Sequence, residues 1–195
     1  RILFILIGHY IIPLPDSTKD AAGLEELAWS YGKNGFDNAI SLFPGINSFF
    51  FSWSLGVLYS LFGRSILLAQ SIGLFFGVIS VFLAWFISEK IWDSQTAIKV
   101  GWIVALFPSL VLYSVLPLRE VYQGFFLLVA FIGIFYWVKQ DSNKYVLLAT
   151  AGFIGATFFH GALILGGILF LLIVFLINVK KMFNSIINSR LNIKA

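Results

Sequence analysis

Residues 145–179 form a nearly uninterrupted apolar run of 35 residues, with a break at His160-Gly161. An α-helix rises about 1.5 Å per residue, so one helix of this length would reach about 50 Å. The hydrocarbon core of a bilayer is only about 30 Å thick. The run is therefore far too long for one crossing, and we expect two membrane spans joined by a tight turn near His160.

The composition agrees with a membrane protein. Apolar residues make up 59% of the chain and charged residues 11%, whereas soluble domains have about 45–50% and about 25%. These values exclude a soluble globular domain and a disordered tail. The net charge of +4 does not indicate nucleic-acid binding, because the basic residues stand at the ends of apolar runs, where they orient spans. The absence of cysteine excludes disulfide frameworks, thiolate zinc sites and cysteine nucleophiles.

The apolar runs predict an all-α, polytopic membrane bundle of about six spans that forms a single transmembrane module over residues 1–195. We expect this module to be part of a longer protein, because the chain begins at Arg1 and its only methionine is Met182. The expected spans are residues 2–14 (incomplete), 65–88, 100–116 with Pro108 inside it, 121–138, and the two halves of 145–179.

Residues 15–64 are expected to form an outward loop that carries two membrane-surface helices. In the first, apolar residues recur at i, i+3, i+4 and i+7, which is the spacing of one helix face, and Gly32 and Gly35 end it. The second is the short apolar segment 46–62, read as a juxtamembrane helix. The face of the first helix comprises Leu24, Leu27, Ala28 and Tyr31, and its candidate N-caps are Asp16, Ser17 and Thr18.

The distribution of basic residues supports a segment 46–62 that does not cross the membrane. In that topology nine lysines and arginines lie inside and four lie outside, as the positive-inside rule requires. If 46–62 crosses, a basic cluster faces outward. The preferred topology makes 180–195 a cytoplasmic basic tail and brings Asp16, Asp20, Glu120 and His160 to the non-cytoplasmic face. The inside set is Arg1, Lys90, Lys99, Lys139, Lys144, Lys180, Lys181, Arg190 and Lys194.

Four sites carry ionisable side chains that could do chemistry. Asp16 and Asp20 could act as a general base or bind a divalent metal, or they could be helix caps or solvated acids. Arg119-Glu120 interrupts two apolar runs, so its charges are functional candidates, with a loop pair facing water as the alternative. Glu120 could join Asp20 as a metal ligand, and Arg119 could hold a phosphate. His160 could contact a phosphate or transfer a proton, or it could bond a backbone carbonyl at the turn.

The order of these elements resembles the membrane glycosyltransferases of the GT-C fold, in particular the protein O-mannosyltransferase and aminoarabinose transferase branch. Leu24 stands where that family has an aromatic residue, and His160 stands where it often has arginine or lysine. The resemblance covers the amino-terminal module of such an enzyme. Its motifs are Asp20 to Ala28, Pro44 to Gly63, Leu106-Phe107-Pro108-Ser109, Tyr113-Ser114 leading to Arg119-Glu120, Phe125-Phe126, and Gly152 to Gly161.

The resemblance implies that a sugar passes, with inversion, from a polyprenyl-phosphate donor to an acceptor glycan, lipid or protein. It implies a catalytic role for Asp20, with Asp16 as the substitute, a metal- or acceptor-binding role for Glu120, and donor-phosphate binding by His160, helped by Arg119. A divalent metal, Mg²⁺ or Mn²⁺, would be held by Asp20 and Glu120. The implied location is the inner or plasma membrane, with the active face outward.

Two other functions fit the same residues. A transporter or flippase of lipid-linked sugars would line its pathway with Arg119, Glu120 and His160, and it would place ionisable groups near the middle of the membrane. A non-catalytic membrane scaffold would leave the acidic residues solvated.

Overall fold

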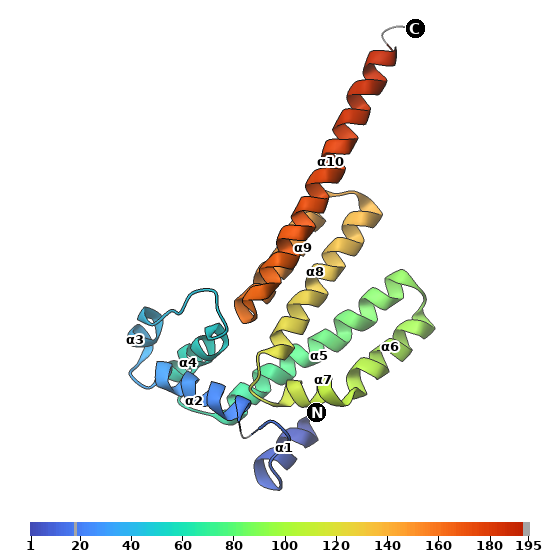
Figure 1. Ribbon diagram of the computed structural model, residues 1–195. Helices are drawn as coiled ribbons and strands as arrows, with labels where there is room; N and C mark the ends of the chain where they lie inside the picture. Colours follow the sequence, from blue (N-terminus) through green and yellow to red (C-terminus); the bar gives the residue numbers. More distant parts are fainter. Residues whose placement is uncertain (18, 193–195) are drawn as a thin grey trace.

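The computed structural model describes residues 1–17 and 19–192, and every regular element within them is a helix. The expected all-helical fold is confirmed. Figure 1 shows long up-and-down helices with a group of shorter helices at one end. The elements are α1 (Ile2–Tyr10), α2 (Asp20–Gly32), α3 (Phe36–Ser41), α4 (Phe50–Phe62), α5 (Ile66–Ile91), α6 (Ser94–Leu106), α7 (Pro108–Val115), α8 (Glu120–Gln140), α9 (Asn143–Phe159), the short η1 (Gly161–Leu163) and α10 (Ile164–Asn192).

Three helical segments of the described chain are long and apolar enough to cross a membrane by themselves: Ile66–Ile91, Glu120–Gln140 and Gly161–Asn184. The chain is therefore an integral membrane protein by the length and composition of its helices. The expected spans at 65–88 and 121–138 coincide with α5 and α8. Helices α1 and α9 have 9 and 17 residues, so the count of six spans stays a prediction.

The expected span at 100–116 is not one straight helix. It is divided into α6 and α7, whose axes differ by 56°, and the pair counts as a fourth crossing only if it acts as one broken span. The cause is Pro108, which has no N–H and pushes the preceding residue out of the helical region. Phe107 accordingly has φ −60° and ψ 119°. Helix α6 also begins earlier than expected, because the Asp93 carboxylate accepts the Thr96 N–H at 2.8 Å and caps it.

The long apolar run turns at the expected place. Helix α9 ends at Phe159, His160 has extended backbone angles, and the chain reverses through η1 into α10. In Figure 1, α9 descends beside α8 and α10 ascends again. The turn that the length of the run predicts is therefore confirmed, and it lies at the end of the bundle that carries α2.

Helix α2 lies where the sequence predicts a helix, but it does not have the predicted cap. The helix begins at Asp20 after Lys19, so Asp16 and Ser17 lie too far upstream to cap it, and Thr18 lies outside the described residues. Asp16 and Ser17 instead form a turn in which the Ser17 N–H and hydroxyl both donate to the Leu14 carbonyl. The buried face of α2 consists of Ala21, Glu25, Ala28 and Gly32.

Helix α4 covers this face of α2. The contact is close because both helices present glycine: a Cβ on Gly56 would lie 2.6 Å from the Ala28 carbonyl oxygen. Ser52 on α4 also donates its hydroxyl to the Leu24 carbonyl at 2.8 Å. The helices α2 and α4 therefore pack as a pair, and a helix lies within the apolar segment 46–62 at Phe50–Phe62; its position at the membrane surface stays a prediction.

The position of Arg1 differs from the one expected from the distribution of basic residues. Arg1 was grouped with the loops at 89–99 and 139–144. In the structure its guanidinium lies against Gly77, near the middle of α5, and donates to the Val104 carbonyl at 3.1 Å. The short α1 places its first residue inside the bundle, so Arg1 does not belong with the loop charges.

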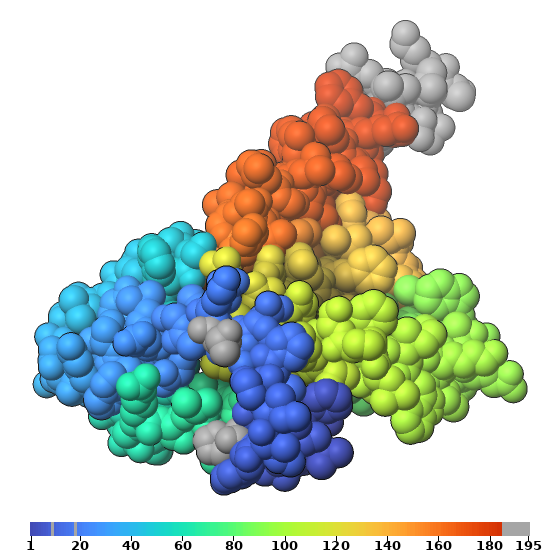
Figure 2. Space-filling view, turned by 60° about the horizontal axis from the view of Figure 1, so that its bottom comes forward, coloured from blue at the N-terminus to red at the C-terminus, as the bar shows by residue number. Residues whose placement is uncertain are grey.

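The bundle has two distinct ends. Figure 2 looks towards the end that carries α1 to α4 and the α6–α7 region. The α7–α8 connection and the α9–α10 turn reach this same end in Figure 1, while the α5–α6 and α8–α9 connections lie at the other.

Labelling of single cysteines tests this arrangement, since the chain has none of its own. We expect cysteines at Asp20 and His160 to react with a membrane-impermeant maleimide from one side of a sealed vesicle. Cysteines at Gln95 and Asn143 should react only from the other side. Reaction of the cysteines at 20 and 160 from opposite sides would contradict the fold.

Candidate functional site

Asp20 lies beside the connection that carries Glu120. It is the exposed first residue of α2. The next residue, Ala21, is buried against Leu116 and Leu118 of the α7–α8 connection. Two acidic residues a hundred positions apart in the sequence therefore come to the same end of the bundle.

Glu120 begins α8, and its two carboxylate oxygens have different surroundings. Oε1 lies 3.6 Å from Nε of Arg119, a loose ion pair. Oε2 is buried and has no hydrogen-bond partner among the described residues. Since an unpaired buried carboxylate oxygen is destabilising, this oxygen is the polar atom of the site that most needs a partner.

His160 lies at the same end, close to the first turn of α8. It is exposed and follows Phe159, whose ring stacks on Tyr122 with centroids 5.1 Å apart and planes 10° apart. Its backbone N–H donates to Ala156 and closes α9. His160 therefore lies at the end of the bundle where α8 begins, while the neighbouring phenyl ring enters the core.

Asp16 is the other acidic residue that was predicted for the site. It is exposed and has a φ of 61°, a left-handed conformation that aspartate tolerates in turns. It lies in the turn before α2 and not at the start of the helix. It keeps its predicted role only as the substitute for Asp20.

The residues expected to bind metal do not form a complete site by themselves. In the described chain, no group of three or more histidine, aspartate or glutamate side chains is placed to hold a metal ion. Asp20 and Glu120 could supply two ligands, and Mg²⁺ or Mn²⁺ would take its remaining ligands from water and substrate oxygens. We assign no reaction step to a metal.

An apolar groove of about 540 Å³ lies between α4, α5, α8 and α9. Tyr122 and Ser54 provide its only side-chain hydroxyls. Tyr122 and Phe159 line it, so the groove reaches the first turn of α8 and the last turn of α9. Its aromatic wall consists of Phe50, Phe51, Phe76, Phe126, Phe158 and Phe159.

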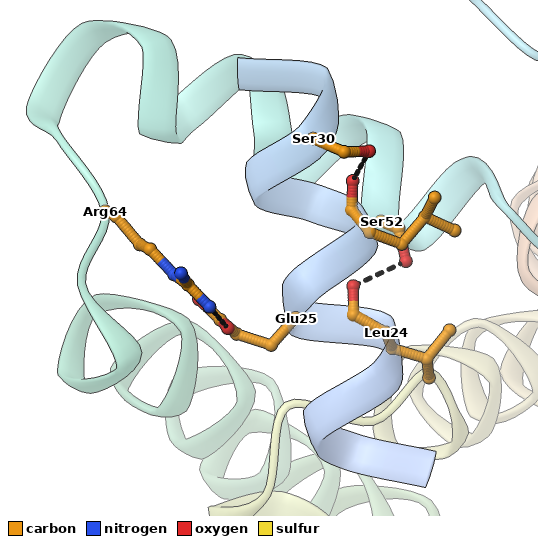
Figure 3. A network of polar contacts seen from close by, with 6 residues as sticks. Leu24, Glu25, Ser30, Ser52 and Arg64 are labelled. Carbon is orange, nitrogen blue, oxygen red and sulfur yellow. Dashed lines mark hydrogen bonds and ion pairs between the residues drawn. The ribbon is translucent and has the colours of Figure 1, made fainter. Parts of the chain in front are cut away.

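An ion pair with a buried carboxylate joins α2 to the residue that follows α4, and it was not predicted from the sequence. Arg64, which follows α4, donates from Nε and Nη2 to the two oxygens of Glu25 at 3.0 and 2.6 Å (Figure 3). Glu25 is 4% exposed. The Tyr59 hydroxyl is buried beside this carboxylate without a hydrogen bond of normal geometry. Burial, and then the negative charge of Glu25, raise the pKa of Tyr59.

A signal for this pair was present in the sequence. Glu25 stands in phase with Ala21, Ala28 and Gly32, which are small residues suited to a close helix contact. A carboxylate on such a face requires a cation when it is buried. The sequence does not show which cation, because Arg64 is 39 residues away.

The chain matches no family model, and no curated protein or solved structure is found to be similar to it. The resemblance to the GT-C glycosyltransferases is therefore carried by the motif residues alone.

Proposed function

We propose that this protein is a membrane glycosyltransferase that uses a polyprenyl-phosphate-linked sugar as donor. One observation carries the proposal: the starts of α2 and α8 and the α9–α10 turn, which carry Asp20, Glu120 and His160, lie at the same end of a membrane helical bundle (Figure 1), and an apolar, aromatic groove reaches the first turn of α8 and the last turn of α9. A donor of this class has the same two parts, an apolar chain and a charged, sugar-bearing head. The bilayer delivers such a donor to the groove directly.

In the proposed reaction, Asp20 accepts the proton of the acceptor hydroxyl as its oxygen attacks the anomeric carbon. The new C–O bond forms on the face opposite the phosphate, and the bond from the anomeric carbon to the phosphate oxygen breaks, so the configuration inverts. The lipid phosphate leaves with the electron pair of that bond. His160 and Arg119 bind the phosphate and stabilise its negative charge.

Asp20 suits the base because it is exposed at the edge of the site, where an acceptor glycan, lipid or protein can approach. Glu120 is more enclosed and lies beside the donor, so its role is to hold the substrate. In this proposal the reaction takes place on the non-cytoplasmic face of the inner or plasma membrane, and the distribution of basic residues favours that orientation of the site.

The test measures the release of polyprenyl phosphate from lipid-linked glucose, mannose or galactose by the full chain in proteoliposomes containing membrane acceptors. We expect Asp20→Asn to lower the rate at least about 100-fold, the range of a lost general base. Glu120→Gln should lower it at least about tenfold, because a charge-assisted contact is removed. Asp37→Asn is the matched control, since this acid is exposed on the neighbouring helix α3.

Two results would contradict the proposal. Unchanged release by both variants would remove Asp20 and Glu120 from the reaction. No release by the unaltered protein from any of the three donors, with movement of the intact lipid between leaflets instead, would favour a flippase.

A further inference from the structure

A second, smaller cavity of about 270 Å³ lies on the other side of Glu120, enclosed by α5, α6, α7 and α8. Its walls are mostly aliphatic, but four side chains with polar atoms line it: Arg1, Ser80, Tyr113 and Glu120. The cavity combines a cation, an anion and two hydroxyls in surroundings where unpaired polar groups are costly. The aromatic groove described above has no charged lining residue, so the two spaces differ in kind.

The guanidinium of Arg1 is held in a position built for it. Nη2 donates to the Val104 carbonyl at 3.1 Å. On the opposite side is Gly77, where an added Cβ would lie 2.5 Å from Nη1 and 2.5 Å from the Ser114 Cβ. A glycine at 77 thus leaves the space that the guanidinium occupies. One hydrogen bond uses only one of the five N–H groups of arginine, so donors remain for a ligand.

Glu120 contributes the opposite charge to the same cavity. Arg119 neutralises it only loosely from outside at 3.6 Å. The buried Oε2 finds no acceptor or donor partner within the described part of the chain. The cavity therefore offers unused donors on Arg1 and an unused acceptor on Glu120.

The donors of Arg1 and the acceptor of Glu120 together favour a ligand without net charge. An anion would meet Glu120, a cation would meet Arg1, and an apolar group would satisfy neither the remaining donors of Arg1 nor the buried Oε2 of Glu120. A neutral group with several hydroxyls can accept from the guanidinium and donate to the carboxylate at once. The volume, at the small end for a ligand site, suits one ring.

We propose that the cavity between Arg1 and Glu120 binds the sugar ring of the lipid-linked donor. The inference rests on the proposed function for the class of donor. The proposal adds two points to that function. The sugar ring lies in this cavity, and Arg1 binds it, although no sequence motif assigned a role to Arg1. With the sugar here and the lipid chain in the aromatic groove, the anomeric carbon lies beside Glu120, between the two spaces.

The test compares the binding of two lipids to the purified full chain by native mass spectrometry: polyprenyl phosphate and the same lipid carrying one hexose. The unaltered protein should bind the sugar-bearing lipid at least about tenfold more tightly, since a hydrogen bond to a charged group is worth about that factor. Arg1→Gln and Gly77→Ala should each abolish this preference. Their affinity for the bare lipid phosphate should stay within about twofold of the original.

Gly101→Ala is the matched control, because this helical glycine lies outside the cavity and its added Cβ would make an ordinary 3.6 Å contact with Trp85. It should keep the full preference.

A preference that survives both Arg1→Gln and Gly77→Ala overturns the sugar site and leaves the proposed function standing. Loss of bare lipid binding in the variants also overturns it, because the cavity would then hold the phosphate or support the fold. If the unaltered protein binds neither lipid, the proposed function itself fails.

Discussion

Replacing Gly152 by alanine is expected to destabilise the α8–α9 hairpin by about 2–3 kcal/mol, the upper part of the range for overpacking of about 1–3 kcal/mol. A Cβ at 152 would lie 2.7 Å from the Ala130 Cα and 2.8 Å from its Cβ. Across the same interface, a Cβ at Gly133 would lie 2.7 Å from the Ala149 Cα. Because these neighbours include backbone atoms, no side-chain rotation relieves the clash. Membrane helices associate through such small residues.

Gly124→Ala is the control for this substitution, since it adds the same methyl group to α8 where nothing lies within 4 Å. It should leave stability unchanged or raise it by up to about 1 kcal/mol, the difference in helix propensity. The measurement is thermal or denaturant unfolding of both variants in the same detergent. Equal stability of the two would show that α8 and α9 do not approach as closely as the structure places them.

The second large effect is expected from Arg64→Ala, which leaves the Glu25 carboxylate buried without its cation. Breaking a fully buried ion pair in this way costs about 3–5 kcal/mol. Arg64 is 43% exposed, so water replaces part of the lost interaction and we expect about 2–3 kcal/mol. The contact of Arg64 with Trp29, 5.9 Å from the ring centroid, is lost as well.

Two comparisons isolate the charge from the packing. Adding Glu25→Leu to Arg64→Ala removes both charges and should recover most of the lost stability, because the buried carboxylate is gone. Lys181→Ala breaks the Lys181–Asp141 pair, whose side chains are 50% and 67% exposed, and it should change stability by less than about 0.5 kcal/mol. If Arg64→Ala lowers stability by no more than Lys181→Ala does, the Glu25–Arg64 pair does not stabilise the contact between α2 and the end of α4.

Reading the sequence was most successful where a local pattern decides the structure. The apolar runs of α5 and α8, and the break at His160 in an overlong run, follow from comparing helix rise with bilayer thickness. At 100–116 the sequence did not show that Pro108 divides the segment into two helices, and the prediction was wrong for the cap of α2, which begins at Asp20. In both places a single residue's backbone conformation outweighed the general pattern.

The candidate site could be predicted only in part. Asp20, Glu120 and His160 were found because each charged or imidazole group interrupts or borders an apolar run. Arg1 was counted with the inside charges, and Glu25 was not assigned to a site, because their partners are remote in the chain. Arg1 bonds Val104 across 103 positions, and Arg64 bonds Glu25 across 39.

The sequence by itself determined the main helices and showed that they are suited to a bilayer. The reason is that the length and polarity of a segment are local properties, which do not depend on how the rest of the chain packs. Folding was needed to decide which charges share a space. Whether a carboxylate meets a guanidinium, a cavity or water depends on how helices far apart in sequence pack, and here glycines such as Gly56, Gly77 and Gly152 set those distances by the side chains they lack.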